Sequence, residues 1–237
     1  MDPVQLLCAN LILVLAASVQ GVLGFGVALL SAPLLNIIDP GFVPVPIILS
    51  GLVLALLVGI TEHSAFSVAA VKWPIAGNWV GAALGGTTLA LLTPRAFQLL
   101  FSLLVMLAVV LSAFKAHLRR SARNGLLVGL VSGYMGVTTS ISGPPVALYF
   151  HALPADQLRA NLSGFFVAAA IVALGAVYLA GMWGWQETRL FLSIQPGLVV
   201  GFIISRTLIR RYRLHNLRQW VLIFVGLIAA ATFWDAL

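Results

Sequence analysis

The 237-residue sequence has very little charge. Only 8% of its residues are Asp, Glu, Lys or Arg, whereas 61% are hydrophobic, and soluble globular chains carry about 25% charged residues. Several apolar runs reach the ~20 residues that are needed to cross a hydrocarbon core of ~30 Å. The composition therefore excludes a soluble domain and predicts an all-α integral membrane protein that crosses the bilayer several times.

Cysteine is almost absent, and this excludes two kinds of site. A single cysteine, Cys8, can form neither an intrachain disulfide nor a thiolate metal cluster. The sequence also lacks a phosphate-binding motif of the P-loop type, so we expect no metal and no cofactor. The net charge of +7 does not indicate a nucleic-acid partner, because the basic residues fall between apolar runs, where they set membrane topology.

Acidic residues are few, and their positions exclude a class of transporter. All six lie at the ends of apolar runs or in loops: Asp2, Asp39, Glu62, Asp156, Glu187 and Asp235. A metal or proton-coupled cation carrier usually places a carboxylate at membrane depth. We therefore expect a cavity built by this chain to favour anions.

Two apolar regions are poor continuous helices, because glycine and proline interrupt them. The first covers residues 4–38 and includes GVLGFGVALLSAPLL at 21–35, and the second covers residues 125–150 and includes GYMGVTTSISGPPVALYF at 133–150. Proline lacks an amide donor and disfavours a helical conformation just before it. Irregular backbone survives at membrane depth only where protein or a watery cavity covers it. Both regions are therefore candidate binding sites.

The chain reads as two copies of one unit, a first repeat over residues 1–118 and a second over 119–237. Matched residues lie 112 to 120 positions apart: Gly21 and Gly133, Gly24 and Gly136, Pro33 and Pro145, Ser50 and Ser163, Gly51 and Gly164, and GNWVG at 77–81 and GLVVG at 197–201. Duplication is the usual build of secondary transporters. Since GNWVG and GLVVG have glycines four apart, we interpret them as helix-packing seams rather than ligand sites.

Three cleaner spans follow each broken region. They are predicted at about 46–60, 74–92 and 96–114 in the first repeat, and at about 161–183, 190–205 and 220–236 in the second. If all eight regions cross once, the basic residues split seven to six between the two sides, which carries no orientation signal. If both broken regions are instead re-entrant, entering and leaving on one face, eleven bases share one side and only Arg95 and Arg189 lie opposite. Each repeat then keeps three crossings, an odd number, so we predict two inverted repeats.

The re-entrant arrangement makes a prediction about two loops. Cysteines introduced at positions 118 and 214 should react with a membrane-impermeant thiol reagent from the same side of the membrane, because both loops belong to the basic face. Reaction from opposite sides would contradict the arrangement.

The broken regions also supply the chemistry of a candidate anion site. Helix starts after Gly26 and after Gly143 would each present unpaired amide hydrogens and about half a positive charge. The hydroxyls at 138–142 would donate to the oxygens of an anion or, alternatively, bond to helix carbonyls. Arg159 would hold an anion at the mouth or serve only as a topology charge. The candidate substrate-binding residues are Gly24, Phe25, Gly26, Ser31, Thr138, Thr139, Ser140, Ser142, Gly143, Pro144, Arg159, Asn161 and Ser163.

These motifs carry a resemblance to a known family. The two broken regions, with LPADQLRANLSGFF at 153–166, resemble the sulfite exporter TauE/SafE family of bacterial membrane permeases over essentially the whole chain. GPPVALYF with the downstream Leu-Pro and Arg-Ala is the most specific part. The resemblance implies a multi-pass protein of the bacterial inner membrane that moves small sulfur-containing anions, such as sulfite or organosulfonates, often outward.

The leading hypothesis is a secondary transporter of small anions and not an enzyme. The expected partners are the anionic substrate and the lipid bilayer, and a homo-oligomer remains open. An anion channel of the same architecture shares every sequence feature used above. An intramembrane enzyme would need a nucleophile and a base, and only Ser140 or Ser142 with His151 offers such a pair, without an acidic residue at depth to orient it.

Overall fold

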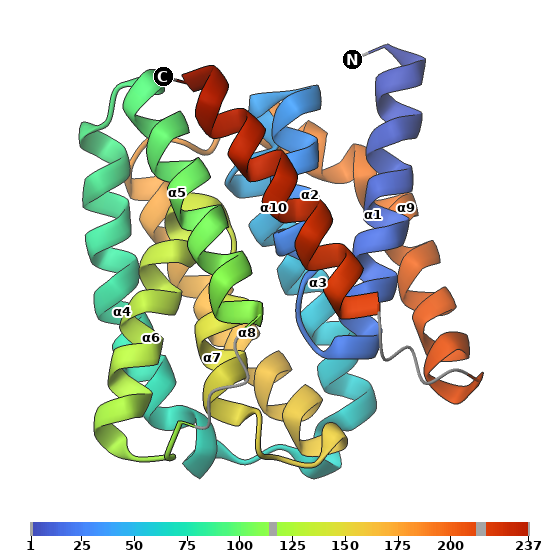
Figure 1. The fold of residues 1–237 in the computed structure, drawn as a ribbon, viewed down its shortest axis with the longest axis vertical. Coiled ribbons are helices and arrows are strands. Elements are labelled where there is room, and N and C mark those ends of the chain that lie inside the picture. The colour runs from blue at the N-terminus through green and yellow to red at the C-terminus, as the bar shows by residue number, and fades with distance from the viewer. Residues whose placement is uncertain (1, 114–117, 212–216, 237) are drawn as a thin grey trace.

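The computed structural model describes residues 2–113, 118–211 and 217–236, which form a bundle of α-helices without a strand (Figure 1). The helices are α1 (Pro3–Leu23), α2 (Val27–Ile38), α3 (Val45–Glu62), α4 (Val68–Leu91), α5 (Pro94–Ala113), α6 (Ala122–Thr139), α7 (Gly143–Phe150), α8 (Ala155–Leu179), α9 (Trp185–Arg211) and α10 (Leu217–Ala236). Two short 3-10 turns, η1 (Pro40–Phe42) and η2 (His63–Ala65), precede α3 and α4. The predicted all-α class is confirmed.

Five of these helices are long and apolar enough to cross a membrane: α1, α3, α5, α8 and α9. The 24 residues of α4 extend over about 36 Å at a rise of about 1.5 Å per residue, which exceeds a hydrocarbon core of ~30 Å. The outer surface is apolar as well, with Leu91 and Leu179 more than four-fifths exposed. The chain is therefore a multi-pass membrane protein.

Both glycine-rich regions are divided into two helices. In the first, α1 ends at Leu23 and α2 begins at Val27, and Gly24 and Gly26 between them have φ angles of +83° and +122°. These left-handed conformations favour glycine, because it has no Cβ. In the second, α6 ends at Thr139 and α7 begins at Gly143. The two prolines occupy the first turn of α7, where a missing amide hydrogen breaks no helical bond.

The ends of the divided helices do not follow the spacing of the glycine motifs. Gly24 and Ser140 both close their helices in the left-handed conformation and lie 116 residues apart, as do the first residues of α2 and α7. The glycine matches in the sequence have an offset of 112. The second break is thus one helical turn later than the motifs predict, and a serine, with φ of +64°, closes α6 where a glycine closes α1.

Each divided region begins and ends at one end of the bundle. Tyr149, near the end of α7, donates a hydrogen bond of 3.2 Å to the carbonyl of Ser121, which precedes α6. In the first half, α1 begins beside α9, where Asn10 donates to the carbonyl of Ser193. Gly41, in the turn after α2, lies against Leu190 at the start of α9. In Figure 1, α2 and α7 accordingly lead back toward the ends from which α1 and α6 start.

The paired glycine motifs are helix-packing seams, as the sequence predicted. A Cβ atom on Gly77 or Gly81 would collide with the backbone of α6 at Leu126 or Leu130. On Gly197 or Gly201, it would collide in the same way with the backbone of α1. Each divided region therefore packs through its first helix on a glycine seam in the other half of the chain, α6 on α4 and α1 on α9.

A seam glycine should tolerate no side chain. We expect Gly81→Ala to lower the free energy of unfolding by about 1–3 kcal/mol, because the added methyl group meets backbone that cannot rotate away. Thermal unfolding of the purified protein in detergent measures the effect. Gly175→Ala is the matched control, since a Cβ added to Gly175 in α8 would have no atom within 4 Å, and equal melting temperatures for the two variants would contradict the seam.

Candidate functional site

A cavity lies between the two helix breaks. Its wall includes residues 26–29 from the first break and residues 140–144 from the second. Small or apolar residues of α3 and α8, such as Gly51 and Ala170, complete the wall. The space open to the centre of a water molecule is about 60 Å³, which is room for about four waters. A guest of a few heavy atoms therefore fits.

The first break contains hydrogen-bond donors in residues that line this cavity. Gln20, in the last turn of α1, accepts a hydrogen bond of 2.9 Å from the amide of Val27, the first residue of α2. The amides of Ala28 and Leu29 also belong to the first turn, where no helical carbonyl is available to accept from them, and both residues line the cavity. Because its Oε1 is held by an amide hydrogen, Gln20 keeps its NH₂ group available for other contacts.

The second break brings its backbone against the first. A Cβ atom on Gly143 would lie 3.2 Å from the Cβ of Phe25, so the two breaks touch. Ser140 donates a hydrogen bond of 3.0 Å to the carbonyl of Pro44, just before α3. The carbonyl of Ser142 accepts one of 2.8 Å from Ser132. These bonds hold the irregular segment in place while both serines line the cavity.

Asn78 of α4 is a cavity residue that the sequence reasoning missed. Its side chain is buried, with 2% of the residue exposed, and its Oδ1 has no hydrogen-bond partner in the described part of the chain. The available signal was the difference between GNWVG and GLVVG, in which an asparagine replaces a buried leucine, Leu198. Gln20 was missed too, because it precedes the glycine motif.

Several predicted site residues lie outside the cavity wall and make structural hydrogen bonds. The hydroxyls of Thr138, Thr139, Ser31 and Ser163 donate to carbonyls three or four residues back in their own helices. Asn161 accepts a bond of 3.0 Å from the amide of Ser67 and donates to Gln157. Of the thirteen candidates, the cavity is lined by Gly26, Ser140, Ser142, Gly143 and Pro144.

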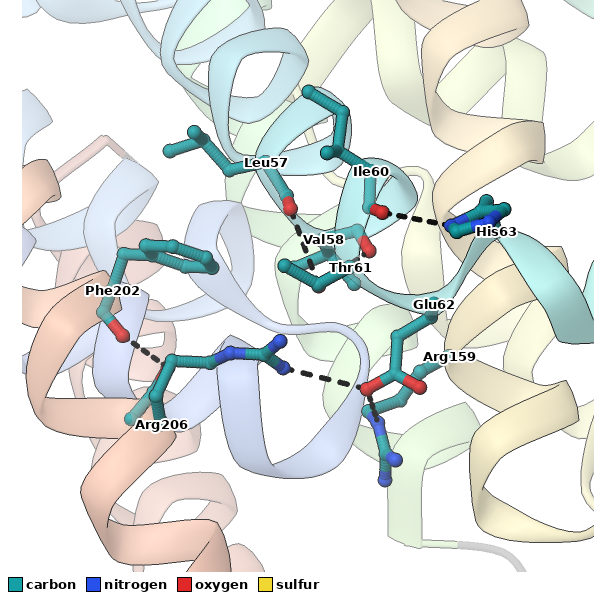
Figure 2. Close-up of polar contacts among 10 residues, drawn as sticks. Leu57, Val58, Ile60, Thr61, Glu62, His63, Arg159, Phe202 and Arg206 are labelled. Atoms are coloured by element: carbon teal, nitrogen blue, oxygen red, sulfur yellow. Dashed lines mark hydrogen bonds and ion pairs between the residues drawn. The ribbon is translucent and has the colours of Figure 1, made fainter.

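Arg159 pairs with a carboxylate of the protein. Its Nε lies 3.3 Å from Oε1 of Glu62, and Nη1 of Arg206 lies 3.4 Å from the same oxygen (Figure 2). The three residues come from α8, α3 and α9. A Cβ atom on Gly24 would lie 3.2 Å from the Cγ of Arg159. The stem of Arg159 therefore covers the first break, while its guanidinium joins the ends of three helices.

An all-helical membrane protein with a cavity between two divided helices has the architecture of a transport protein. The chain belongs to the sulfite exporter TauE/SafE family, whose model matches residues 9–232. The resemblance seen in the motifs is thus confirmed. No curated protein and no solved structure matches the chain. Membership in this family implies a membrane transporter of sulfur-related anions.

The ion pairs around Glu62 should differ in strength. Side chains of Arg159 and Glu62 are 15% and 17% exposed, whereas that of Arg206 is 38% exposed. We expect Arg159→Gln to lower the free energy of unfolding by about 2 kcal/mol and Arg206→Gln by less than about 1 kcal/mol, because solvent screens the more exposed pair.

The measurement is again thermal unfolding in detergent. Glu62→Gln should have the largest effect of the three, since it leaves two neighbouring guanidinium groups without their shared carboxylate. Equal melting temperatures for the two arginine variants would contradict this order.

Proposed function

We propose that the protein is a secondary transporter of small anions, most specifically sulfite or organosulfonates, with the cavity between the two breaks as its substrate site. The observation that carries the proposal is the composition of the cavity wall. Both helix starts, α2 and α7, contribute to it, and no acidic side chain does among the described residues. Family membership supports the sulfur-containing substrate.

Substrate oxygens would accept hydrogen bonds from the first turn of α2 and from neighbouring side chains. The amides of Ala28 and Leu29, the NH₂ group of Gln20 and the hydroxyl of Ser142 are donors in residues that line the cavity. Donors fixed by the fold bind an oxyanion without the ordering that flexible side chains require. The amide of Gly143 adds a donor from the second break.

We infer that the chain consists of two inverted repeats, each with a re-entrant region and three full crossings. This inference is supported by the paths of two helices: α2 leads back toward the end where α1 starts, and α7 leads back toward the end where α6 starts. The bases support it as well. Arg120 lines a surface hollow together with Ser67 and Tyr149. Arg159 pairs with Glu62, the last residue of α3, which η2 directly follows on the way to α4. Of the two loop positions predicted to share this face, position 118 is among the described residues and position 214 lies outside them.

Export would begin at the basic face. Arg159 and Arg206 outnumber Glu62 there, so the local potential attracts anions. Because Arg159 covers Gly24 and is bonded to Glu62, access to the first break from this face requires that the ion pair separate or that α8 move relative to α3. Movement of one repeat against the other, with the site between them, is the expected mode of alternating access.

The transport hypothesis is tested by uptake into proteoliposomes against a panel of sulfite, alkylsulfonates, sulfate and carboxylates. We expect saturable uptake and counterflow with a sulfur-containing anion. The variant Ser140→Ala plus Ser142→Ala should reduce uptake of the preferred anion about tenfold, the cost of losing a hydrogen bond to a charged group.

Ser193→Ala is the matched control, because the hydroxyl of Ser193 bonds within α9, to the carbonyl of Leu190, and Ser193 is not among the cavity residues. Unchanged uptake by the double variant would refute the site, and non-saturating flux without counterflow would indicate a channel.

A further inference from the structure

The amide of Asn78 has a position that packing does not explain. In the seam between α1 and α9, the equivalent place is taken by Leu198, which is fully buried. A leucine therefore satisfies the same kind of helix contact. Asn78 instead places a polar group in the cavity wall, with its Oδ1 lacking a partner in the described residues. Buried polar groups without partners are rare and unfavourable, so this acceptor oxygen calls for a ligand that can donate a hydrogen bond.

The cavity wall carries no formal charge among the residues that the structure describes. Its positive potential comes from the starts of α2 and α7, each equivalent to about half a positive charge. Because the carbonyl ends of α1 and α6 lie at the same two breaks and oppose them, these partial charges offset at most one negative charge. A second negative charge would remain uncompensated in a water-poor site, where an unpaired charge is strongly unfavourable.

We propose that the cavity selects singly charged anions and that Asn78 is the specificity-determining side chain that contacts them. The inference rests on the transport function proposed above and narrows its substrate class. The amide of Asn78 can donate to an anion oxygen and can also accept a hydrogen bond from a protonated one. Hydrogensulfite meets both conditions, because it carries one negative charge and one proton. Alkylsulfonates meet the charge condition and can accept from the NH₂ group of Asn78, whereas the sulfite and sulfate dianions exceed the charge limit.

Three anions of similar size test the charge rule. Methanesulfonate is a monoanion throughout, sulfate is a dianion near neutral pH, and methylphosphonate changes from monoanion to dianion as the pH rises through neutrality. Binding to the purified protein in detergent is followed by the shift in melting temperature and by competition against methanesulfonate. We expect methylphosphonate to compete at the acidic end of the range and to lose at least tenfold in affinity at the alkaline end, while methanesulfonate binds equally at both.

Two substitutions test Asn78. Asn78→Leu installs the residue of the equivalent seam, so it should leave the melting temperature unchanged or raise it. It should weaken methanesulfonate binding about ten- to hundredfold, the range for a hydrogen bond to a charged group. Asn78→Asp keeps the shape but adds a negative charge, and should abolish binding at neutral pH.

Asn124 provides matched controls, because it lies partly exposed in the first turn of α6 and bonds to the carbonyl of Arg119. Asn124→Leu and Asn124→Asp should bind methanesulfonate like the unmodified protein. Wild-type binding by Asn78→Leu would overturn the role of Asn78.

Equal affinity for sulfate and methanesulfonate would overturn the charge rule and leave anion transport standing. If the folded protein binds none of the three anions or hydrogensulfite, and moves none across a membrane, the proposed function itself fails.

Discussion

Backbone groups at membrane depth must find hydrogen-bond partners, and this requirement shapes the centre of the molecule. The chain breaks between α1 and α2 and between α6 and α7, and each break exposes amides and carbonyls. At the first, Gln20 takes the amide of Val27. At the second, Ser132 donates to Ser142, and Ser140 donates to Pro44. Side chains satisfy part of the demand, while the residues of the first turn of α2 line a cavity. The two breaks thereby create the cavity that we propose as an anion site.

The glycine seams make that arrangement possible. Because no side chain separates α4 from α6, or α1 from α9, the backbones of the divided helices are held close to a helix of the other half. Close backbone contact fixes the position of the end of α1 relative to α9, and of the end of α6 relative to α4. Both breaks consequently reach one cavity, where Gly143 lies against Phe25. Larger seam residues would move the breaks apart and open the site to lipid or water.

The sequence was sufficient to predict the fold class, the two divided regions and the seams. Composition indicates the class, and glycine spacing and proline indicate where a helix breaks or packs closely, without knowledge of distant contacts. The exact end of α6 could not be predicted. Ser140 adopts the left-handed conformation that Gly24 adopts in the first half, and a serine carries no sequence signal for it. The hydroxyls of Thr138 and Thr139 were candidate donors to a substrate, but both donate to carbonyls of their own helix. Whether such a hydroxyl reaches the cavity depends on the face of the helix on which it lies, and the local sequence does not specify that face. Asn78 and Gln20 reach the cavity through tertiary packing, which no local pattern encodes.

Charge is distributed by depth in this protein, and that distribution has a physical logic. Formal charges stay at the helix ends, where Glu62, Arg159 and Arg206 are partly solvated, and the described residues of the cavity wall offer only dipoles and neutral polar groups. A lysine or arginine in the cavity would bind an anion more tightly, but would also hold it there, since a charge pair in a low-dielectric site separates at high cost. A transporter must release what it binds. Partial charges from helix ends suit that need, because they stabilise a single negative charge without forming an ion pair that must be broken in every cycle.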